Sequence, residues 1–380
     1  MRRRKSRAWR ASSPSPSTES VNAFSRAGDL SRQIGDTPSQ FRALWGVGAF
    51  HFVRGDQHKA REIAEQCIAF AQHANDDDAL IEAHYLLGIT RCVGGDFVSG
   101  CIELEAAVEL YGNDVRETHR LLYGQDAKAA ALGWLAMARW VLGHPDEALA
   151  KARQGLAFVR DATQPFLLAR GMAGVGFIYV FGREPRGPDS ELPTVLALCA
   201  EQGFAYFHAV VSAFQGANLV LLGNNEKGIE LMRASLAALR AMGSELLLTL
   251  ILVNLANAHL VLGHIDEARA VVDEGFSAAE RNGEHWADSE LHRLRGQLAQ
   301  IQGSTPAEVE TWLRKALAIA REQKAKAFEL RASAALAQNL HHQCRKDEAR
   351  ALLTGAVGEW SNELDGVDLR DARELLAKFG

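Results

Sequence analysis

The sequence predicts an all-α fold, an α-solenoid of about eight helical hairpins with a period of about 40 residues, wound into a right-handed superhelix. Three observations support this. Alanine and leucine dominate the 380 residues, whereas aromatic residues make up 7% and there are 9 prolines. This composition favours helices over sandwiches, barrels and βαβ units. Small residues recur about every 40 residues, and a turn position follows each of them seven residues later.

The recurring small residue marks one position in the first helix of each predicted hairpin, here called helix A. A helix that crosses its neighbour closely needs a residue without bulk at the contact point. We therefore expect the glycines of the series, from Gly88 onward, to be buried where helix A meets its partner helices. Successive members are 40 residues apart, with one step of 48 and one of 41. The series is Gly48, Gly88, Ala136, Gly176, Gly216, Ala256, Gly296 and Ala337.

The turn position ends helix A. Glycine is common there because a helix often ends in a left-handed conformation that costs other residues more. The series is Gly55, Gly95, Gly143, Arg183, Gly223, Gly263, Gly303 and Cys344.

A second helix, helix B, follows each turn, as in Leu142–Leu156 and Leu262–Phe276. Pro145 and Asp146 are typical of a helix start, since proline lacks an N–H that would be unpaired there and a carboxylate favours the positive end of the helix dipole. A third series of mostly small residues marks helix B with the same period: Cys67, Ala107, Gly155, Val195, Ser235, Gly275, Ala316 and Ala356.

The two ends differ from the repeats. Residues 1–20 are basic and then Ser/Pro-rich, which predicts a disordered tail before a solenoid that covers residues 21–380. The last helix, about Leu369–Phe379, mixes charged and apolar residues and is expected to cap the array. Only the short stretch Val21–Ile34 precedes the first helix A, so we expect an exposed apolar end there, prone to self-association or to docking of another domain. Its apolar residues are Phe41, Leu44, Trp45 and Phe50.

Charge and cysteine content narrow the class of protein. The net charge of −5 argues against a nucleic-acid partner, and five cysteines without a CxxC pair suggest a reducing, cytoplasmic compartment. Two uncharged stretches, 202–225 and 246–265, are long enough to span a bilayer. Both are in register with the repeat and contain amide and histidine side chains, which predicts buried helices and no membrane partner.

The small residue, the turn seven residues later and an alanine five residues after the turn resemble the tetratricopeptide repeat (TPR). That alanine is present at Ala60, Ala148, Ala268 and Ala349. The period is longer than the usual repeat, which implies long-helix variants.

A narrower resemblance covers about Val21–Phe379. It lies in the segments IGDTP (34–38), LYGQD (122–126), GEHWADSEL (283–291) and LRKALAIAREQKAKAFELRA (313–332). These segments resemble the TPR region that forms the C-terminal part of bacterial signalling proteins with a class III adenylate/guanylate cyclase and an AAA- or STAND-type ATPase. The resemblance implies a regulatory module.

Catalytic and metal-binding motifs are not recognised in the chain. The sequence has no GxxxxGK[ST] loop, no HExxH and no GxSxG elbow, so we expect no enzyme activity, no cofactor and no metal. Asp76–Asp78 and the His341–Cys344 segment are weak cation candidates. Helix capping and a solvated helix end, respectively, explain them better.

The concave face of a TPR superhelix is formed mainly by helix A. Counting from the small-residue series predicts partner-binding residues there at Trp134, Met137, Phe177, Phe214, Asn254 and Asn257. The same count also places Trp45, Tyr85, Trp140, Arg293 and Gln297 toward that face. The alternative is that many of these side chains only pack between neighbouring hairpins.

The leading hypothesis is therefore a non-enzymatic TPR scaffold that binds a protein or peptide segment, such as a cyclase or ATPase module. Rigid aromatic side chains beside amides suit peptide recognition, because they bury area at low entropic cost. The second hypothesis is a small-ligand sensor that encloses a metabolite inside the superhelix.

Overall fold

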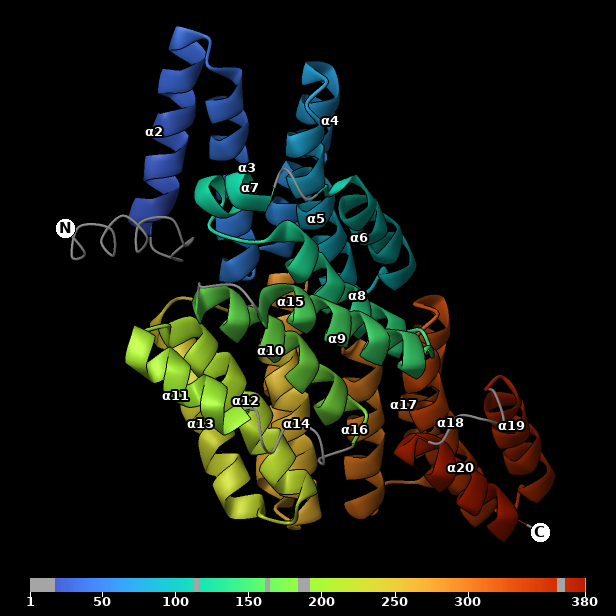
Figure 1. Ribbon diagram of the computed structural model, residues 1–380. Coiled ribbons are helices and arrows are strands. Elements are labelled where there is room, and N and C mark those ends of the chain that lie inside the picture. Colours follow the sequence, from blue (N-terminus) through green and yellow to red (C-terminus); the bar gives the residue numbers. More distant parts are fainter. Residues whose placement is uncertain (1–17, 113–115, 161–164, 184–191, 361–365, 380) are drawn as a thin grey trace.

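The computed structural model describes residues 18–112, 116–160, 165–183, 192–360 and 366–379. These residues form nineteen helices and no strand, which confirms the all-α solenoid (Figure 1). Sixteen of the helices form the eight expected A–B hairpins. They are α3 (Thr37–Arg54) with α4 (Gln57–Ala74), α5 (Asp77–Val93) with α6 (Phe97–Leu110), α8 (Ala127–Val141) with α9 (Pro145–Arg160), α10 (Pro165–Phe181) with α11 (Leu192–Gln202), α12 (Ala205–Leu221) with α13 (Asn225–Ala241), α14 (Leu248–Val261) with α15 (Ile265–Asn282), α16 (Asp288–Ile301) with α17 (Pro306–Glu322), and α18 (Lys326–His342) with α19 (Lys346–Gly358).

The turn series is confirmed by the backbone. All eight turn residues have positive φ, from 56° at Arg183 to 91° at Gly143. Arg183 and Cys344 adopt this conformation without being glycines, which shows that the period and not glycine alone defines the turn.

The small-residue series is confirmed by packing. Gly88, Gly176, Gly216 and Gly296 are buried in their A helices. A Cβ added at Gly88 would lie 2.6 Å from Leu104 Cγ, and one at Gly296 would lie 2.7 Å from Leu313 Cδ2. Both contacts are too close for carbon atoms, so these helices cross at a distance that only glycine permits.

Three further helices complete the chain: α2 (Thr18–Ile34), α7 (Arg116–Leu122) and α20 (Val367–Lys378). The predicted tail lies outside the described residues except for Thr18–Ser20, which begin α2. Helix α2 packs against α3, and the ring of Phe24 lies against Gly46. The expectation of an exposed apolar N-terminal end was wrong for the residues it named: Phe41, Trp45 and Phe50 are buried and Leu44 is half-buried. Phe41 and Trp45 pack against Tyr123, and the large apolar side chains exposed on α2 are instead Leu30 and Ile34.

Helix α7 lies in the 48-residue step of the series and is attached by a buried polar cluster. The Glu82 carboxylate accepts hydrogen bonds from Gln125 at 2.6 Å and from His119 at 2.9 Å, and all three residues are buried. Burial opposes the charge on His119, but the Glu82 contact outweighs it and raises the His119 pKa. Gln125 belongs to the LYGQD segment, and its hydrogen bond to Glu82 attaches the residues of the longer, 48-residue step to α5.

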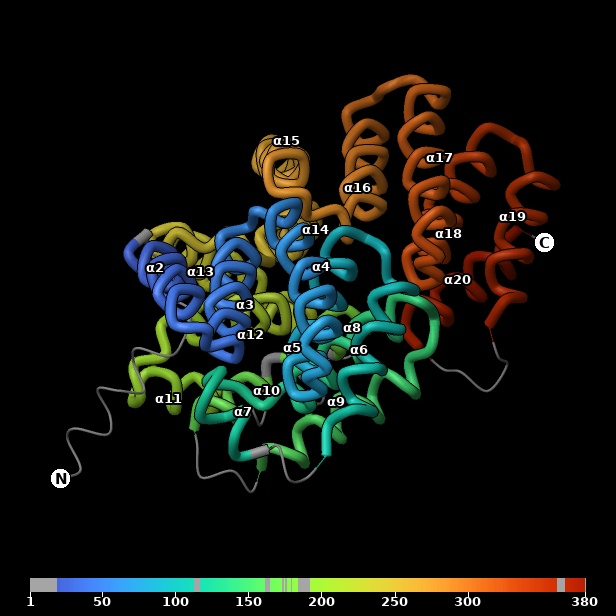
Figure 2. Tube along the Cα trace, turned by 90° about the horizontal axis from the view of Figure 1, so that it is seen from above, coloured from blue at the N-terminus to red at the C-terminus, as the bar shows by residue number. Residues whose placement is uncertain are grey.

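The superhelix winds far enough that its later part returns against its earlier part (Figures 1 and 2). The segments before α14 and α16 meet the ends of α3 and α5, α18 meets α8, and Asp368 of α20 pairs with Arg183 just after α10. We call this contact the inter-turn seam. The carbonyl of Val53 accepts hydrogen bonds from Glu245 N at 3.3 Å and Ser244 Oγ at 3.0 Å. One hairpin further on, the carbonyl of Val93 accepts from His285 N at 3.0 Å and Trp286 N at 3.1 Å.

The seam therefore repeats with the hairpins, and it satisfies carbonyls at helix ends that have no partner within their own helix. The glycines that end helices α3 and α8 lie close to the second superhelical turn, which is formed by the later hairpins from α14 onward. A Cβ at Gly55 or Gly143 would lie 2.8 Å from the Cβ of Glu245 or Lys326, respectively. The equivalent Gly223, Gly263 and Gly303, in later hairpins, have open space around them.

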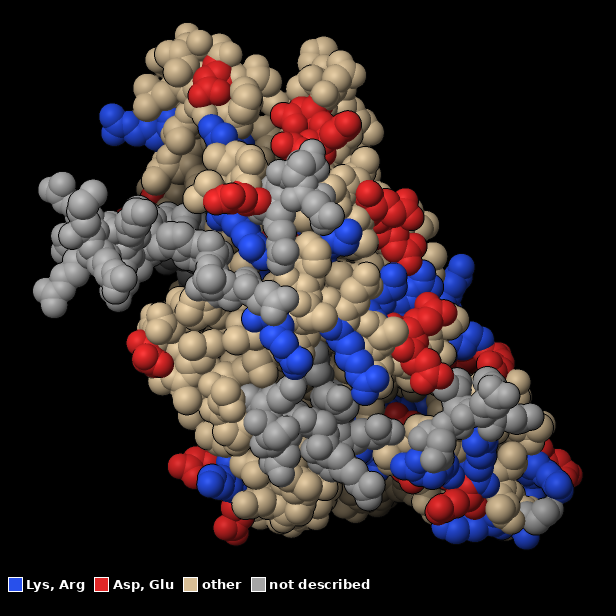
Figure 3. All heavy atoms as spheres, in the orientation of Figure 1, with Lys and Arg blue, Asp and Glu red and all other residues tan. Residues whose placement is uncertain are grey.

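The face drawn in Figure 3 carries interspersed acidic and basic side chains near the C-terminal helices and few charges over α11 and α12. Among the described residues, none of the helices is both long and apolar enough to cross a bilayer. The two uncharged stretches form α12 and α14 of the solenoid, as expected.

Candidate functional site: the interior cavity

A cavity of about 860 Å³ lies inside the superhelix. Its wall is formed by α3, α5, α8, α10 and α12, the A helices of the first five hairpins, and by the segments that precede α14 and α16. The wall is rich in aromatic rings: Trp45, Phe52, Tyr85, Tyr123, Trp134, Phe166, Phe177, Phe204, Tyr206, Phe207, Phe214 and Trp286.

Four of the six predicted binding residues line this cavity together. They are Trp134, Met137, Phe177 and Phe214. Trp45 and Tyr85, which the same count placed inward, also line it.

Asn254 and Asn257 do not join them. Each donates its amide to a carbonyl of its own helix, Leu250 and Val253, both at 2.9 Å. Their position in helix A matches that of Trp134 and Met137, but α14 belongs to the second superhelical turn. The predicted binding surface is therefore divided between a cavity and a separate polar region.

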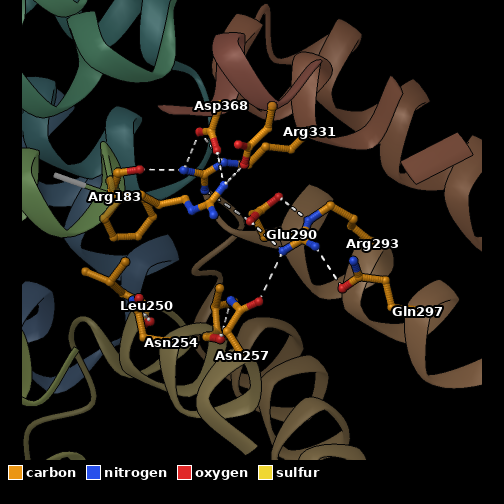
Figure 4. A network of polar contacts seen from close by, with 12 residues as sticks. Arg183, Leu250, Asn254, Asn257, Glu290, Arg293, Gln297, Arg331 and Asp368 are labelled. Atoms are coloured by element: carbon orange, nitrogen blue, oxygen red, sulfur yellow. Dashed lines mark hydrogen bonds and ion pairs between the residues drawn. The ribbon is translucent and has the colours of Figure 1, made fainter. Parts of the chain in front are cut away.

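That polar region is a network of buried charges (Figure 4). Glu290 on α16 binds Arg293 at 2.8 Å and Arg331 at 3.3 Å, and its side chain is 1% exposed. Arg331 also binds Asp368 of α20 at 2.7 Å. Burial opposes ionisation of Glu290, but the two arginines outweigh it and lower its pKa.

The remaining residues counted inward belong to this network. Arg293 also contacts Gln297 at 2.9 Å and Asn257 at 3.5 Å. Trp140 packs under the Arg331 guanidinium, 5.2 Å from it. The network joins the second superhelical turn and the C-terminal helix α20 to α10, because Arg331 donates to the carbonyl of Phe181 and Arg183 pairs with Asp368 at 3.1 Å. These residues have structural partners, which fits the packing alternative for them.

Trp286 closes the cavity from the second turn. Its ring lies 6.4 Å from Trp134 and is stacked 5.9 Å from Phe177. Its indole N–H donates to Thr249 Oγ1 at 2.9 Å and to Glu284 Oε1 at 3.0 Å. Counting along helix A could not find Trp286, because it precedes α16; its place in the GEHWADSEL segment was the only signal.

Arg170 on α10 supplies charge to the wall and was also missed. Its guanidinium lies 5.5 Å from the centre of the Tyr85 ring and donates to the Tyr85 hydroxyl. Burial raises the pKa of Tyr85, and the charge of Arg170 opposes that shift only in part. Tyr85 is therefore a neutral phenol at physiological pH.

Glu284 is a buried carboxyl beside the seam, and burial raises its pKa to about 8 from 4.5. Between those two pH values the folded protein holds a proton that the unfolded chain releases, so stability falls as pH rises. We expect Glu284→Gln to abolish this pH dependence, which amounts to at most about 1.4 kcal/mol of unfolding free energy per pH unit.

Urea denaturation between pH 5 and 8.5 measures this effect. Glu280→Gln, at an exposed position of α15, is the matched control and should keep the slope of the parent. An unchanged slope in the Glu284 variant would show that its carboxyl is ionised throughout.

None of the described residues form a group of three or more His, Cys, Asp or Glu able to hold a metal ion. Asp76 instead caps α5, since its carboxylate accepts from Ala79 N at 3.0 Å.

The consecutive helical hairpins and the cavity on their inner side define a TPR-like helical solenoid. Of solved structures, a Rap protein complexed with competence and sporulation factor is similar over 95% of this chain and 98% of that chain, with a TM-score of 0.58 and 12% identity. Aspartyl phosphate phosphatase F of Bacillus subtilis is similar over 78% and 73%, with a TM-score of 0.50 and 11% identity. At such identities the likeness shows the fold.

In sequence, the chain is 28% identical over 239 residues to an uncharacterised protein of Rhizobium meliloti (strain 1021). The match covers 60% of this chain and 22% of that protein, so the chain spans about a fifth of its relative's length. No model of a known protein family matches the chain.

Proposed function

We propose that the protein is a non-enzymatic TPR scaffold that binds an apolar protein segment in its interior cavity. The observation that supports this is the cavity itself, in which Trp134 of α8, Phe177 of α10 and Trp286 of the segment before α16 converge. Clustered, well-packed aromatic side chains are typical of the residues that dominate binding energy in protein interfaces. The Rap protein with a related fold holds competence and sporulation factor, which supports a binding role for this architecture.

The wider setting that we propose is the regulatory region of a bacterial cyclase/ATPase-type signalling protein. Two observations support it. Four sequence segments resemble such regulatory regions, and the region matched in the Rhizobium meliloti relative is 22% of that longer protein. In that setting the occupant of the cavity is a segment of a cyclase or ATPase module.

Binding to an array of short apolar peptides, anchored at their N-termini, tests the proposed function. We expect Gly133→Leu to abolish binding, because Gly133 lines the cavity and a leucine side chain would fill space there. A new Cβ would lie 3.9 Å from Gly174 Cα, an ordinary contact, and thermal melting shows whether the rest of the leucine disturbs the packing of α8 on α10. Trp134→Ala should weaken binding of the selected peptides by at least about 2 kcal/mol. Isothermal titration and thermal melting are measured on each variant.

Gly355→Leu is the matched control. It lies on α19, away from the cavity, with open space around its Cα, and should bind as the parent does. Full binding by a stable Gly133→Leu protein would place the binding surface elsewhere.

A small-ligand sensor is the second candidate, favoured by the volume of about 860 Å³. Pockets for drug-sized molecules commonly measure about 300–1,000 Å³. A thermal-shift screen with metabolites distinguishes the two candidates, since a ligand that binds only the folded state raises the melting temperature.

A further inference from the structure

The charge of Arg170 is the feature of the cavity that peptide binding alone does not explain. Of the described residues that line the cavity, Arg170 alone carries a full charge. It makes no ion pair with any residue that the structure describes; its contacts are the hydroxyl and the ring face of Tyr85. An unpaired cation beside apolar walls attracts an anion strongly, because the surroundings screen charge less than water does.

Two buried carboxyls act on tyrosines of the cavity wall, Glu82 on Tyr85 and Glu284 on Tyr206, and both have other partners. Glu82 is held by His119 and Gln125 at 2.9 and 2.6 Å. Glu284 accepts from the indole of Trp286 and from Thr249 N, and its raised pKa of about 8 leaves it mainly protonated at pH 7. Neither carboxyl forms an ion pair with Arg170.

The rest of the wall limits the kind of anion. Tyr85 offers a neutral O–H that can donate beside the guanidinium, whereas most of the remaining wall is apolar and aromatic. A guanidinium with one neighbouring hydroxyl matches a single carboxylate, which arginine binds through two parallel hydrogen bonds. A phosphate would bring more charge and more acceptors than these donors satisfy.

We propose that the cavity selects an apolar ligand with one carboxylate, which binds Arg170 and the Tyr85 hydroxyl while its apolar part packs among Trp134, Phe177 and Trp286. This inference rests on the proposed function of the cavity and specifies the chemistry of its occupant. The carboxylate can belong to the free C-terminus of a peptide or to a small apolar acid.

Pairs of probes that differ only in charge test the inference and distinguish these sources. The first arm compares array-selected peptides with a free C-terminus and the same peptides amidated. The second compares decanoate with decanol and 4-phenylbutyrate with 4-phenylbutanol. Titration followed by tryptophan fluorescence reports binding, since Trp45, Trp134 and Trp286 line the cavity. We expect the acid of at least one arm to bind about tenfold or more tightly than its neutral partner, because charged hydrogen bonds are the stronger class.

Substitutions at Arg170 locate the effect. Arg170→Gln should reduce acid binding to the level of the neutral partner, whereas Arg170→Lys should keep part of the preference. Arg153→Gln, at an exposed position of α9, should change neither. Equal binding of acid and neutral partner, or an acid preference that survives Arg170→Gln, overturns the inference and leaves the proposed function intact. Binding of no probe in either arm contradicts both.

Discussion

Gly216→Leu is expected to lower the free energy of unfolding by more than the roughly 1–3 kcal/mol usual for overpacking. Helices α12 and α13 cross so closely that a Cβ at Gly216 would lie 2.7 Å from the carbonyl oxygen of Gly228 and 2.8 Å from Met232 Cγ. The reverse contact is as tight, since a Cβ at Gly228 would lie 2.5 Å from the Gly216 oxygen. Backbone cannot turn aside as a side-chain end can, so the two helices must separate.

Gly216→Ala and Gly355→Ala form the matched pair for this prediction, measured by urea denaturation followed by circular dichroism. Gly355 lies in helix α19 with open space around it, so alanine there should stabilise by about 1 kcal/mol through helix propensity. The same exchange at Gly216 should destabilise. A parental midpoint for both Gly216 variants would mean that the close crossing is absent.

Arg331→Met is expected to cost about 3 kcal/mol, the lower end of the range for breaking a buried ion pair, because Glu290 and Asp368 each lose one of their two arginine partners. The side chain of Arg331 is 14% exposed and binds Glu290 at 3.3 Å and Asp368 at 2.7 Å. It also fixes α20 and the end of α10 to the second turn. Methionine keeps the apolar stem over Trp140 and removes the charge, so the loss reports the ion pairs.

Arg345→Met is the control for that measurement. Arg345 also binds two carboxylates, Glu310 at 2.6 Å and Glu348, but its side chain is 38% exposed. Exposed ion pairs contribute about 0–1 kcal/mol. Similar losses in the two variants, measured by urea denaturation, would show that burial of the Arg331 network has no energetic effect.

The sequence was sufficient to predict the hairpins, their turns and the glycine crossings, because each depends on residues close together in the chain. A left-handed turn residue at Gly143 or Cys344 is set by its own hairpin. The helix α2 was missed for a local reason as well: the stretch Val21–Ile34 lacks the repeat pattern, although it packs against α3.

The candidate site was predicted only in part, since its closure depends on the pitch of the superhelix. Trp134 and Asn254 occupy the same place in their A helices, yet only Trp134 lines the cavity. The pitch is the sum of small rotations between neighbouring hairpins, and no single residue encodes it. Trp286, which reaches the first turn, could therefore be located only from the structure.

The inter-turn seam also determines how the protein unfolds. In an open repeat array each unit touches only its neighbours, so stability is a sum of local terms and the ends can unfold separately. Here the carbonyl of Val53 is hydrogen-bonded to Ser244 and Glu245. The carbonyl of Val93 is hydrogen-bonded in the same way to His285 and Trp286, so the early hairpins depend on the late ones. Closing such distant contacts is slow, because the entropy of ordering the intervening chain must be lost first. The solenoid is therefore expected to fold slowly and to lose its structure in one cooperative transition.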